Sequence, residues 1–178
     1  MVKKPERPAA VALNKTGRRI DPGVTLFHER LVGRMVIAWG LLEAAMQDCI
    51  WHILDVPMGD GRIITSRRDA KTKLEWLRSF SKKHFQGEPL ELLTKTLDLI
   101  ELRQDDRNFI MHGVWGTLMP DNEPSAASFR AKSAPDEVIS ETFSEARMRN
   151  IINDIHSAKD DIRAWMNWLE SSRAKQPQ

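Results

Sequence analysis

The most restrictive feature of this sequence is a stretch without proline, from residue 25 to residue 55. Proline breaks a helix because it lacks an amide hydrogen and clashes with the preceding turn, so a stretch of this length without it can form one long helix. Apolar side chains recur along it in steps of three or four residues, with some turns skipped: Leu31, Met35, Leu42, Met46, Cys49 and Ile53. That spacing places them on one face. The sequence therefore predicts a long helix with one buried side.

Two further helices are predicted after this one. Pro57 to Gly61 has the composition of a loop. Ser66 to Asp69 resembles a capping box, in which a serine and a carboxylate three residues later satisfy the first amides of a helix. We expect the second helix to run from this box to about Lys83. After Gly87, a third helix is expected over residues 89 to 112, with an apolar stripe of Leu93, Leu97 and Ile100.

Beyond the third helix, the apolar residues no longer follow the spacing of a helix. Val114 to Met119 and Ser128 to Lys132 read as short strands, and Pro120 to Pro124 between them has the composition of a loop. A small hairpin is therefore expected, and Val138 to Phe143 can add a third short strand.

A last helix is predicted to end near Ser171, because its apolar residues again follow the helical period: Met148, Ile152, Ile155, Ile162 and Trp165. The predicted fold class is mainly α, an antiparallel bundle of about four helices with a small β-hairpin inserted after the third helix. With 178 residues, 41% of them hydrophobic, the chain has the size of one well-buried domain. We expect this domain to occupy residues 23 to 171.

The charge of the chain is uneven. The first twenty residues carry six basic side chains and one acidic side chain, a balance of +5, so the remainder carries −3 of the total of +2. We expect residues 1 to 22 to form a disordered basic tail and residues 172 to 178 a second disordered tail. A basic tail can add salt-sensitive contacts with a phosphate backbone, although most such tails are only solvated.

No run of eighteen apolar residues is present, and the first residues lack the apolar segment of a secretory signal. We therefore expect a soluble cytoplasmic protein without a membrane partner. The single cysteine, Cys49, has no partner for an intrachain disulfide or for a zinc site, and its helical spacing indicates a core position.

The candidate functional residues lie where the third helix meets a glycine, in the segment Arg107 to His112. An arginine can hold a phosphate with a planar fork of donors, and a histidine titrates near neutral pH and can move a proton. The two residues are about 140° apart around an ideal helix, so their side chains converge only if the arginine bends around or a second subunit contributes. Carbonyls at a helix end favour a protonated histidine, whereas the arginine must supply the affinity for an anion.

Arg107, Asn108 and His112, followed by a glycine and a strand late in a helical bundle of this size, resemble the HEPN superfamily. Its members carry an arginine, a polar residue that is commonly asparagine, and a histidine in an R-x(4–6)-H pattern. The architecture is similar over residues 25 to 170, and only the six-residue motif is specific. The resemblance implies a bundle that dimerises so that two motifs face each other and cut RNA without a metal, as many members do in toxin–antitoxin systems or phage defence.

In such an enzyme the ribose 2′-hydroxyl attacks the adjacent phosphorus, and only RNA carries this internal nucleophile. His112 would move protons, Arg107 would stabilise charge on the phosphorus oxygens, and Asn108 would orient the phosphate or the histidine. The implied partners are RNA, a second copy of the chain and an antitoxin or another defence protein. The alternative is a HEPN-like module that binds RNA or protein without catalysis, since some members act as scaffolds.

Four further residues are candidates for a supporting role. Glu43 lies on an apolar helical row, where a carboxylate needs a partner, either a site residue such as Arg107 or water at the edge of the face. Trp115 follows the motif closely enough to line its cleft. Arg67 and Arg68, expected in the first turn of the second helix, can contact a phosphate or belong with Lys71 and Lys73 to a solvated face. Asp106 is expected to be solvated.

Other chemistries find little basis in the sequence. A helical zinc motif is missing because Val32 stands where His28 would need a histidine partner, and no glycine-rich phosphate loop or serine hydrolase motif is present. We therefore expect no metal and no cofactor. A regulator that binds DNA has only the basic tail and the capped second helix in its favour.

Overall fold

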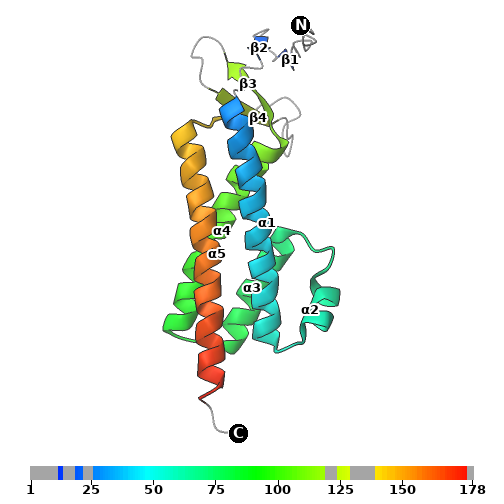
Figure 1. Cartoon of the computed structure of the whole chain (residues 1–178), viewed down its shortest axis with the longest axis vertical. Coiled ribbons are helices and arrows are strands. Elements are labelled where there is room, and N and C mark those ends of the chain that lie inside the picture. Colours follow the sequence, from blue (N-terminus) through cyan, green and yellow to red (C-terminus); the bar gives the residue numbers. More distant parts are fainter. Residues whose placement is uncertain (1–11, 14–18, 22–25, 119–123, 129–138, 176–178) are drawn as a thin grey trace, which may run out of the picture. The chain divides into compact units, whose positions relative to one another are not determined.

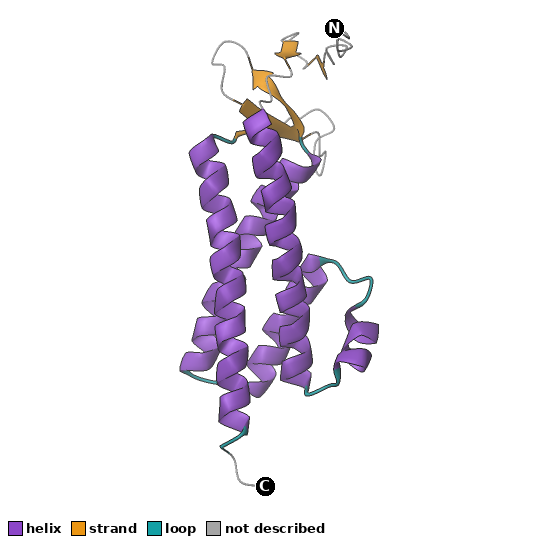
Figure 2. Cartoon of the chain, viewed as in Figure 1, coloured by secondary structure: helices purple, strands orange, loops and turns teal. Residues whose placement is uncertain are grey.

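The computed structural model describes residues 12–13, 19–21, 26–118, 124–128 and 139–175. Among these residues it contains five helices: α1 (Leu26–Leu54), α2 (Met58–Thr65), α3 (Ala70–His84), α4 (Glu88–His112) and α5 (Glu145–Arg173). The strands are short: β1 (Ala12–Leu13), β2 (Arg19–Asp21), β3 (Val114–Leu118), β4 (Pro124–Ser128) and β5 (Ile139–Thr142). Figures 1 and 2 show how far helices dominate the described chain. The prediction of a mainly α helical bundle is confirmed.

Two compact units make up the chain. We call residues 1–33 with 107–149 the sheet unit, and residues 34–106 with 150–178 the bundle unit. The single expected domain over residues 23 to 171 thus has an internal division. None of the helices among the described residues is long and apolar enough to cross a membrane.

The core of the bundle unit is the buried face of each helix. On α1 the predicted apolar positions Met35, Leu42, Met46, Cys49 and Ile53 are all at most 3% exposed. The stripes predicted for α4 and α5 are buried as well: Leu93, Leu97, Ile100, Ile152, Ile155 and Ile162. Burying a side chain of this size contributes about 1.5–3 kcal/mol. The helical periods therefore identified the core of this unit correctly.

Polar contacts join the same helices at their ends. Trp165 Nε1 in α5 donates to the carbonyl of Pro89 in α4 at 2.9 Å. Arg173 Nη1 donates to the carbonyl of His52 at 2.7 Å, which satisfies an acceptor that the end of α1 would otherwise leave open. These bonds fix the first turn of α4 and the last turn of α1 to α5.

Helix α2 was not predicted, because its sequence reads as a loop. It forms against Trp51, whose indole Nε1 donates to Thr65 Oγ1 at 3.2 Å. Gly61 is buried in α2, and a Cβ atom there would overlap the ring of Trp51. The glycine that suggested a loop is thus the residue that lets the helix approach the tryptophan. Packing overrides the low helix propensity of this segment.

The start of α3 also differs from the prediction. Asp69, not Ser66, is the N-cap, and its side chain accepts from the Thr72 amide at 2.8 Å. Hydrogen bonding from the Thr72 side chain, followed by that from the Thr72 amide, lowers the pKa of Asp69. Ser66 instead ends α2, because its amide donates to the carbonyl of Arg62 at 2.8 Å. The presumed capping box therefore spans the connection between two helices.

In the sheet unit the strands are all antiparallel, in the order β1-β2-β3-β4-β5. The expected hairpin is present as β3 and β4, and the expected third strand as β5. The second strand was misplaced: β4 covers Pro124–Ser128, whereas we predicted residues 128 to 132, of which 129 to 132 lie outside the described residues. Its small residues gave little β signal, and pairing with both neighbours defines it.

Strands β1 and β2 lie in the segment expected to be a disordered tail, and β2 pairs with β3. The rest of that segment lies outside the described residues, as do residues 176–178 of the expected tail at the other end, where α5 extends to Arg173.

We predict that Gly61→Ala destabilises the protein by about 1–3 kcal/mol, because the added methyl group displaces the buried Trp51 ring. Gly59→Ala is the matched control in the same helix, where a Cβ atom would meet nothing within 4 Å. It should be neutral or stabilising by up to about 1 kcal/mol. Urea unfolding measures both, and equal effects of the two changes would contradict the packing of α2 on Trp51.

We predict that Cys49 resists alkylation in the folded protein. Burial raises the pKa of its thiol to about 12, so the thiolate fraction at pH 8 is on the order of 10⁻⁴. Iodoacetamide labelling followed by mass spectrometry should therefore find a slow reaction under native conditions and a fast one in denaturant. Rapid labelling of the native protein would place Cys49 outside the core.

Candidate active site

The predicted motif occupies the last turn and a half of α4, within the sheet unit. The helix ends at His112, and the amide of Gly113 still donates to the carbonyl of Phe109 at 2.8 Å. Strand β3 begins immediately afterwards, at Val114. Because helix and strand follow each other with one residue between them, the histidine lies at a helix end that is held by a strand.

Arg107 and His112 converge within one chain. Arg107 Nη1 lies 3.5 Å from His112 Nε2, and the same nitrogen donates to Asn108 Oδ1 at 3.1 Å. The long arginine side chain therefore bends around the helix by the angle that separates the two positions. Of the two routes to convergence considered from the sequence, the first is the one observed.

The exposure and chemistry of these groups fit a permanent cation beside a group that can transfer protons. His112 is exposed, and Arg107 and Asn108 are half-buried. A guanidinium group can only donate, so a hydrogen bond between Arg107 and Nε2 requires a neutral imidazole that accepts there. At 3.5 Å this contact is weak, and a bound anion can replace it at little cost.

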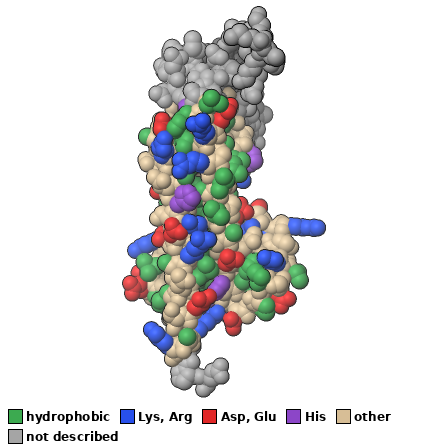
Figure 3. Space-filling model, viewed as in Figure 1, with side chains coloured by type: hydrophobic (Ala, Val, Ile, Leu, Met, Phe, Trp, Pro, Cys, Tyr) green, Lys and Arg blue, Asp and Glu red, His purple; other side chains and the backbone are tan. Residues whose placement is uncertain are grey.

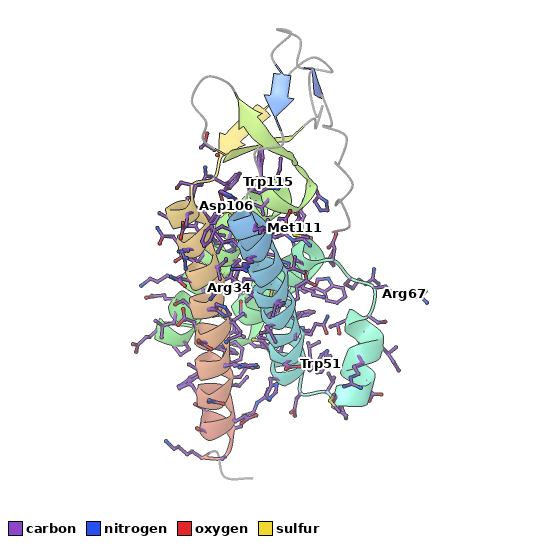
Figure 4. The ribbon with its side chains drawn as sticks, turned by 45° about the horizontal axis from the view of Figure 1, so that its top comes forward. Arg34, Trp51, Arg67, Asp106, Met111 and Trp115 are labelled. Carbon is purple, nitrogen blue, oxygen red and sulfur yellow. The ribbon has the colours of Figure 1, made fainter. Side chains whose placement is uncertain are left out.

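An aromatic cluster supports the motif from the side of the sheet. Trp115 Nε1 donates to the carbonyl of Ile110 at 2.8 Å, which ties β3 to the last turn of α4. The Trp115 ring lies 5.9 Å from that of Phe143 and 6.3 Å from that of His28. We expected Trp115 to line a cleft beside the motif; it is half-buried in this cluster and holds the turn that carries His112. Figure 4 shows it next to the sheet.

His28 was considered from the sequence only as a zinc ligand, and its place in this region was not predicted. It is 7% exposed, between Phe27 and Trp115. The sequence did contain a signal for the burial of His28. His28, Leu31 and Met35 are spaced by three and four residues, so they share the buried face of α1. The isolated histidine thus belongs to the aromatic packing under β3.

Two acidic residues of the bundle unit have different surroundings from those expected. Asp106 was expected to be solvated, yet its side chain is 11% exposed and Arg103 Nη1 donates to it at 2.6 Å. Arg103 also binds Asp154 of α5 at 2.9 Å. The prediction for Asp106 was therefore wrong, because the three-residue spacing brings Arg103 over the carboxylate.

Glu43 has an ion pair, but its partner is Lys73, at 3.3 Å, which was not a candidate residue of the site. Its other carboxylate oxygen accepts from Trp39 Nε1 at 2.6 Å. The Lys73 side chain is 3% exposed, so its assignment to a solvated face was wrong. Lys73 lies on the inner face of α3 with Leu74 and Leu77, since it is four residues before Leu77. Both members of the pair belong to the bundle unit, whereas Arg107 belongs to the sheet unit.

Arg67 and Arg68 precede α3 and do not lie in its first turn. Both are exposed and belong to the bundle unit. Arg67 has a positive φ of 62°, which marks the tight turn before the N-cap, and the Arg68 guanidinium lies 5.6 Å from the centre of the Trp76 ring. The helix predicted as the second one corresponds to α3. Because Arg67 and Arg68 lie outside its first turn, the interaction with its dipole that we proposed for them loses its geometric basis.

No group of three or more histidine, cysteine, aspartate or glutamate side chains suited to a metal ion occurs among the described residues. No protein-family model, curated protein or solved structure matches this chain significantly.

We predict that Trp115→Phe destabilises the protein by about 1–2 kcal/mol. The change keeps an aromatic side chain but removes the indole N–H, which leaves the Ile110 carbonyl without its donor. Trp76→Phe is the control, since no described residue accepts from its indole and its ring packs against Phe80. Urea unfolding gives both values. A Trp115→Phe variant as stable as the control would mean that the indole hydrogen bond does not hold this turn.

Proposed function

We propose that this protein is a metal-independent endoribonuclease of HEPN type, with Arg107 and His112 as its catalytic residues. The observation that carries the proposal is the approach of Arg107 Nη1 to within 3.5 Å of His112 Nε2 at the exposed end of α4. One chain thus brings together a fixed cation and a group that can transfer protons. Phosphodiester cleavage without a metal requires these two functions in close proximity.

The proposed reaction begins with the ribose 2′-hydroxyl. His112 in its neutral form accepts the 2′-hydroxyl proton while the oxygen attacks phosphorus. The bond from phosphorus to the 5′-oxygen breaks, and that oxygen takes up a proton, so the products are a 2′,3′-cyclic phosphate and a 5′-hydroxyl. Because DNA lacks the 2′-hydroxyl, it cannot react in this way.

Arg107 is proposed to stabilise the negative charge that develops on the phosphorus oxygens. Its fork of donors suits a phosphate better than the point charge of a lysine does. Asn108 accepts from the same arginine nitrogen that approaches His112, so its proposed role is to orient the guanidinium. Trp115 is proposed to keep the helix end in place through its bond with the Ile110 carbonyl.

A second histidine would allow one group to act as base while another protonates the leaving oxygen. We therefore propose that the enzyme works as a cytoplasmic homodimer that presents two motifs to one RNA, in a toxin–antitoxin or phage-defence setting. The basic segment near the beginning of the chain has the charge to add contacts with the phosphate backbone.

One observation favours a second candidate, a non-catalytic module that binds RNA or protein. Arg107 is already engaged by Asn108 and His112, as in a polar network whose purpose is structural. A module of this kind would bind its partner through the same surface and leave RNA intact.

We predict that the purified protein cleaves a mixed RNA pool in the presence of EDTA and leaves 2′,3′-cyclic phosphate ends. His112→Ala should lower the rate by about 10²–10⁴, because proton transfer is lost. Arg107→Ala should lower it by about 10²–10³, because charge stabilisation is lost. Gel analysis with end-group assays measures both effects.

His84→Ala is the matched control, because His84 is the exposed last residue of α3, just as His112 is the exposed last residue of α4. It should cleave like the parent. The proposed chemistry is excluded if His112→Ala cleaves as fast as His84→Ala. RNA binding without cleavage by the folded parent would favour the non-catalytic module.

A further inference from the structure

A pocket of about 520 Å³ lies between the first half of α4 and the second half of α5. Its walls come from residues 88–96 and 161–168, which all belong to the bundle unit, so the Arg107–His112 motif takes no part in it. Sites for small ligands commonly have volumes of about 300–1,000 Å³. The pocket therefore has room for a small organic molecule.

The two walls run in opposite directions. Trp165 Nε1 donates to the carbonyl of Pro89 at 2.9 Å, and Arg103 Nε binds Asp154 at 2.9 Å. Residue numbers thus rise along α4 while they fall along α5, which makes the two helices antiparallel. This register fixes which residues of the two walls lie at the same level.

The rim of the pocket differs between its two ends. At one end Lys95 is level with Asp161, so a basic side chain faces an acidic one. At the other end, which we call the aromatic end, Glu88 is level with Trp168, and no basic residue lines the wall there. Glu88 forms no ion pair with another described residue. The aromatic end therefore has a carboxylate and no cation of its own.

The floor of the pocket offers a ligand few polar partners. The indole N–H of Trp165 is engaged by the Pro89 carbonyl, and the Thr96 hydroxyl donates to the carbonyl of Leu92 at 3.3 Å. The remaining surface of the floor is carbon, supplied by Leu93 and the Trp165 ring among others. A ligand must therefore find its polar contacts at the charged rim.

Two indole rings form a corner at the aromatic end. The Trp165 and Trp168 rings lie 5.8 Å apart, and Phe85 packs edge-on against Trp165 at 4.9 Å. Trp165 is thereby held in place, whereas Trp168 is 41% exposed, and Leu92 on the opposite wall is 53% exposed. Figure 3, in the view of Figure 1, shows hydrophobic side chains next to acidic ones along the edge where α4 and α5 run. Exposed large apolar side chains around a concave site are characteristic of a binding surface.

An indole face beside a carboxylate is a combination that recognises an organic cation. The face of a tryptophan attracts an ammonium group more strongly than that of any other aromatic side chain, and a carboxylate adds a direct charge attraction. The chain as a whole carries a net charge of +2, so it supplies no general attraction for cations. The affinity for a cation has to come from the aromatic end itself.

We propose that this pocket binds a small organic cation, whose ammonium group lies against Trp168 and Glu88 and whose apolar body lies along Leu92, Leu93 and Ala164. This second site belongs to the bundle unit and does not depend on the proposed cleavage of RNA.

The first test is a titration with benzyltrimethylammonium, followed through the indole N–H signals in two-dimensional NMR. We expect saturable shifts of the Trp165 and Trp168 signals, with a dissociation constant of about 1 mM or below. Phenylacetate has the same ring with the opposite charge, and tetramethylammonium has the same cation without the ring. Each should bind at least about threefold more weakly than benzyltrimethylammonium.

The second test uses two variants with matched controls. Trp168→Leu keeps an apolar side chain but removes the ring face, so it should weaken binding at least about threefold. Trp76→Leu is its control, because Trp76 belongs to the same unit and lies outside the pocket. Glu88→Gln should weaken binding about twofold to fivefold. Glu91→Gln is its control, since Glu91 is also an exposed acid in the first turn of α4 but does not line the pocket.

Circular dichroism should find all four variants folded, and both controls should bind the cation like the parent. The site is overturned if the parent shows no saturable shift up to about 10 mM of the cation. It is equally overturned if phenylacetate or tetramethylammonium binds as tightly, or if Trp168→Leu binds like Trp76→Leu. Binding is measured without RNA, so none of these results depends on whether the protein cleaves RNA.

Discussion

The bundle unit depends on the burial of the inner face of α1, whose apolar side chains are buried together with those of α3, α4 and α5. Met35, Leu42, Met46 and Cys49 are almost completely buried, and the loss of any one of the larger three would open a cavity that rigid helices cannot close. The same helix also has an exposed apolar face. Since a helix has a fixed period, residues one position apart fall on different sides, so one helix can carry both a buried face and an exposed apolar face.

The candidate active site depends on the C-terminal end of a helix, α4, and not on a helix face. At the end of α4, carbonyls lose their partners and the chain can turn into a strand after one glycine. His112 is thereby exposed while the indole of Trp115 fixes the turn before it. In the proposed reaction, exposure lets His112 reach an RNA chain, and a fixed position favours proton transfer. The arrangement offers both, and Arg107 adds the charge.

Several polar residues acquired their surroundings from the packing of neighbouring helices. Lys73 and Asp106 were both expected at the surface, and both are largely buried in ion pairs, with Glu43 and Arg103 respectively. The expectation for Lys73 overlooked its spacing: it lies four residues before Leu77 and so shares the buried face of α3, wherever the helix begins. The Arg103 pair lies within one helix and could have been recognised from its spacing.

The sequence by itself determined the four long helices, their buried stripes and the place of the Arg107–His112 motif at a helix end, because a strong helical period over many residues outweighs local composition. The tertiary structure decided the rest. Helix α2 exists because Gly61 fits against Trp51, and strand β4 exists because β3 and β5 flank it. The approach of Arg107 to His112 likewise follows from one side-chain conformation among many. Each of these depends on which groups meet in space, and residue type and spacing alone do not contain that information.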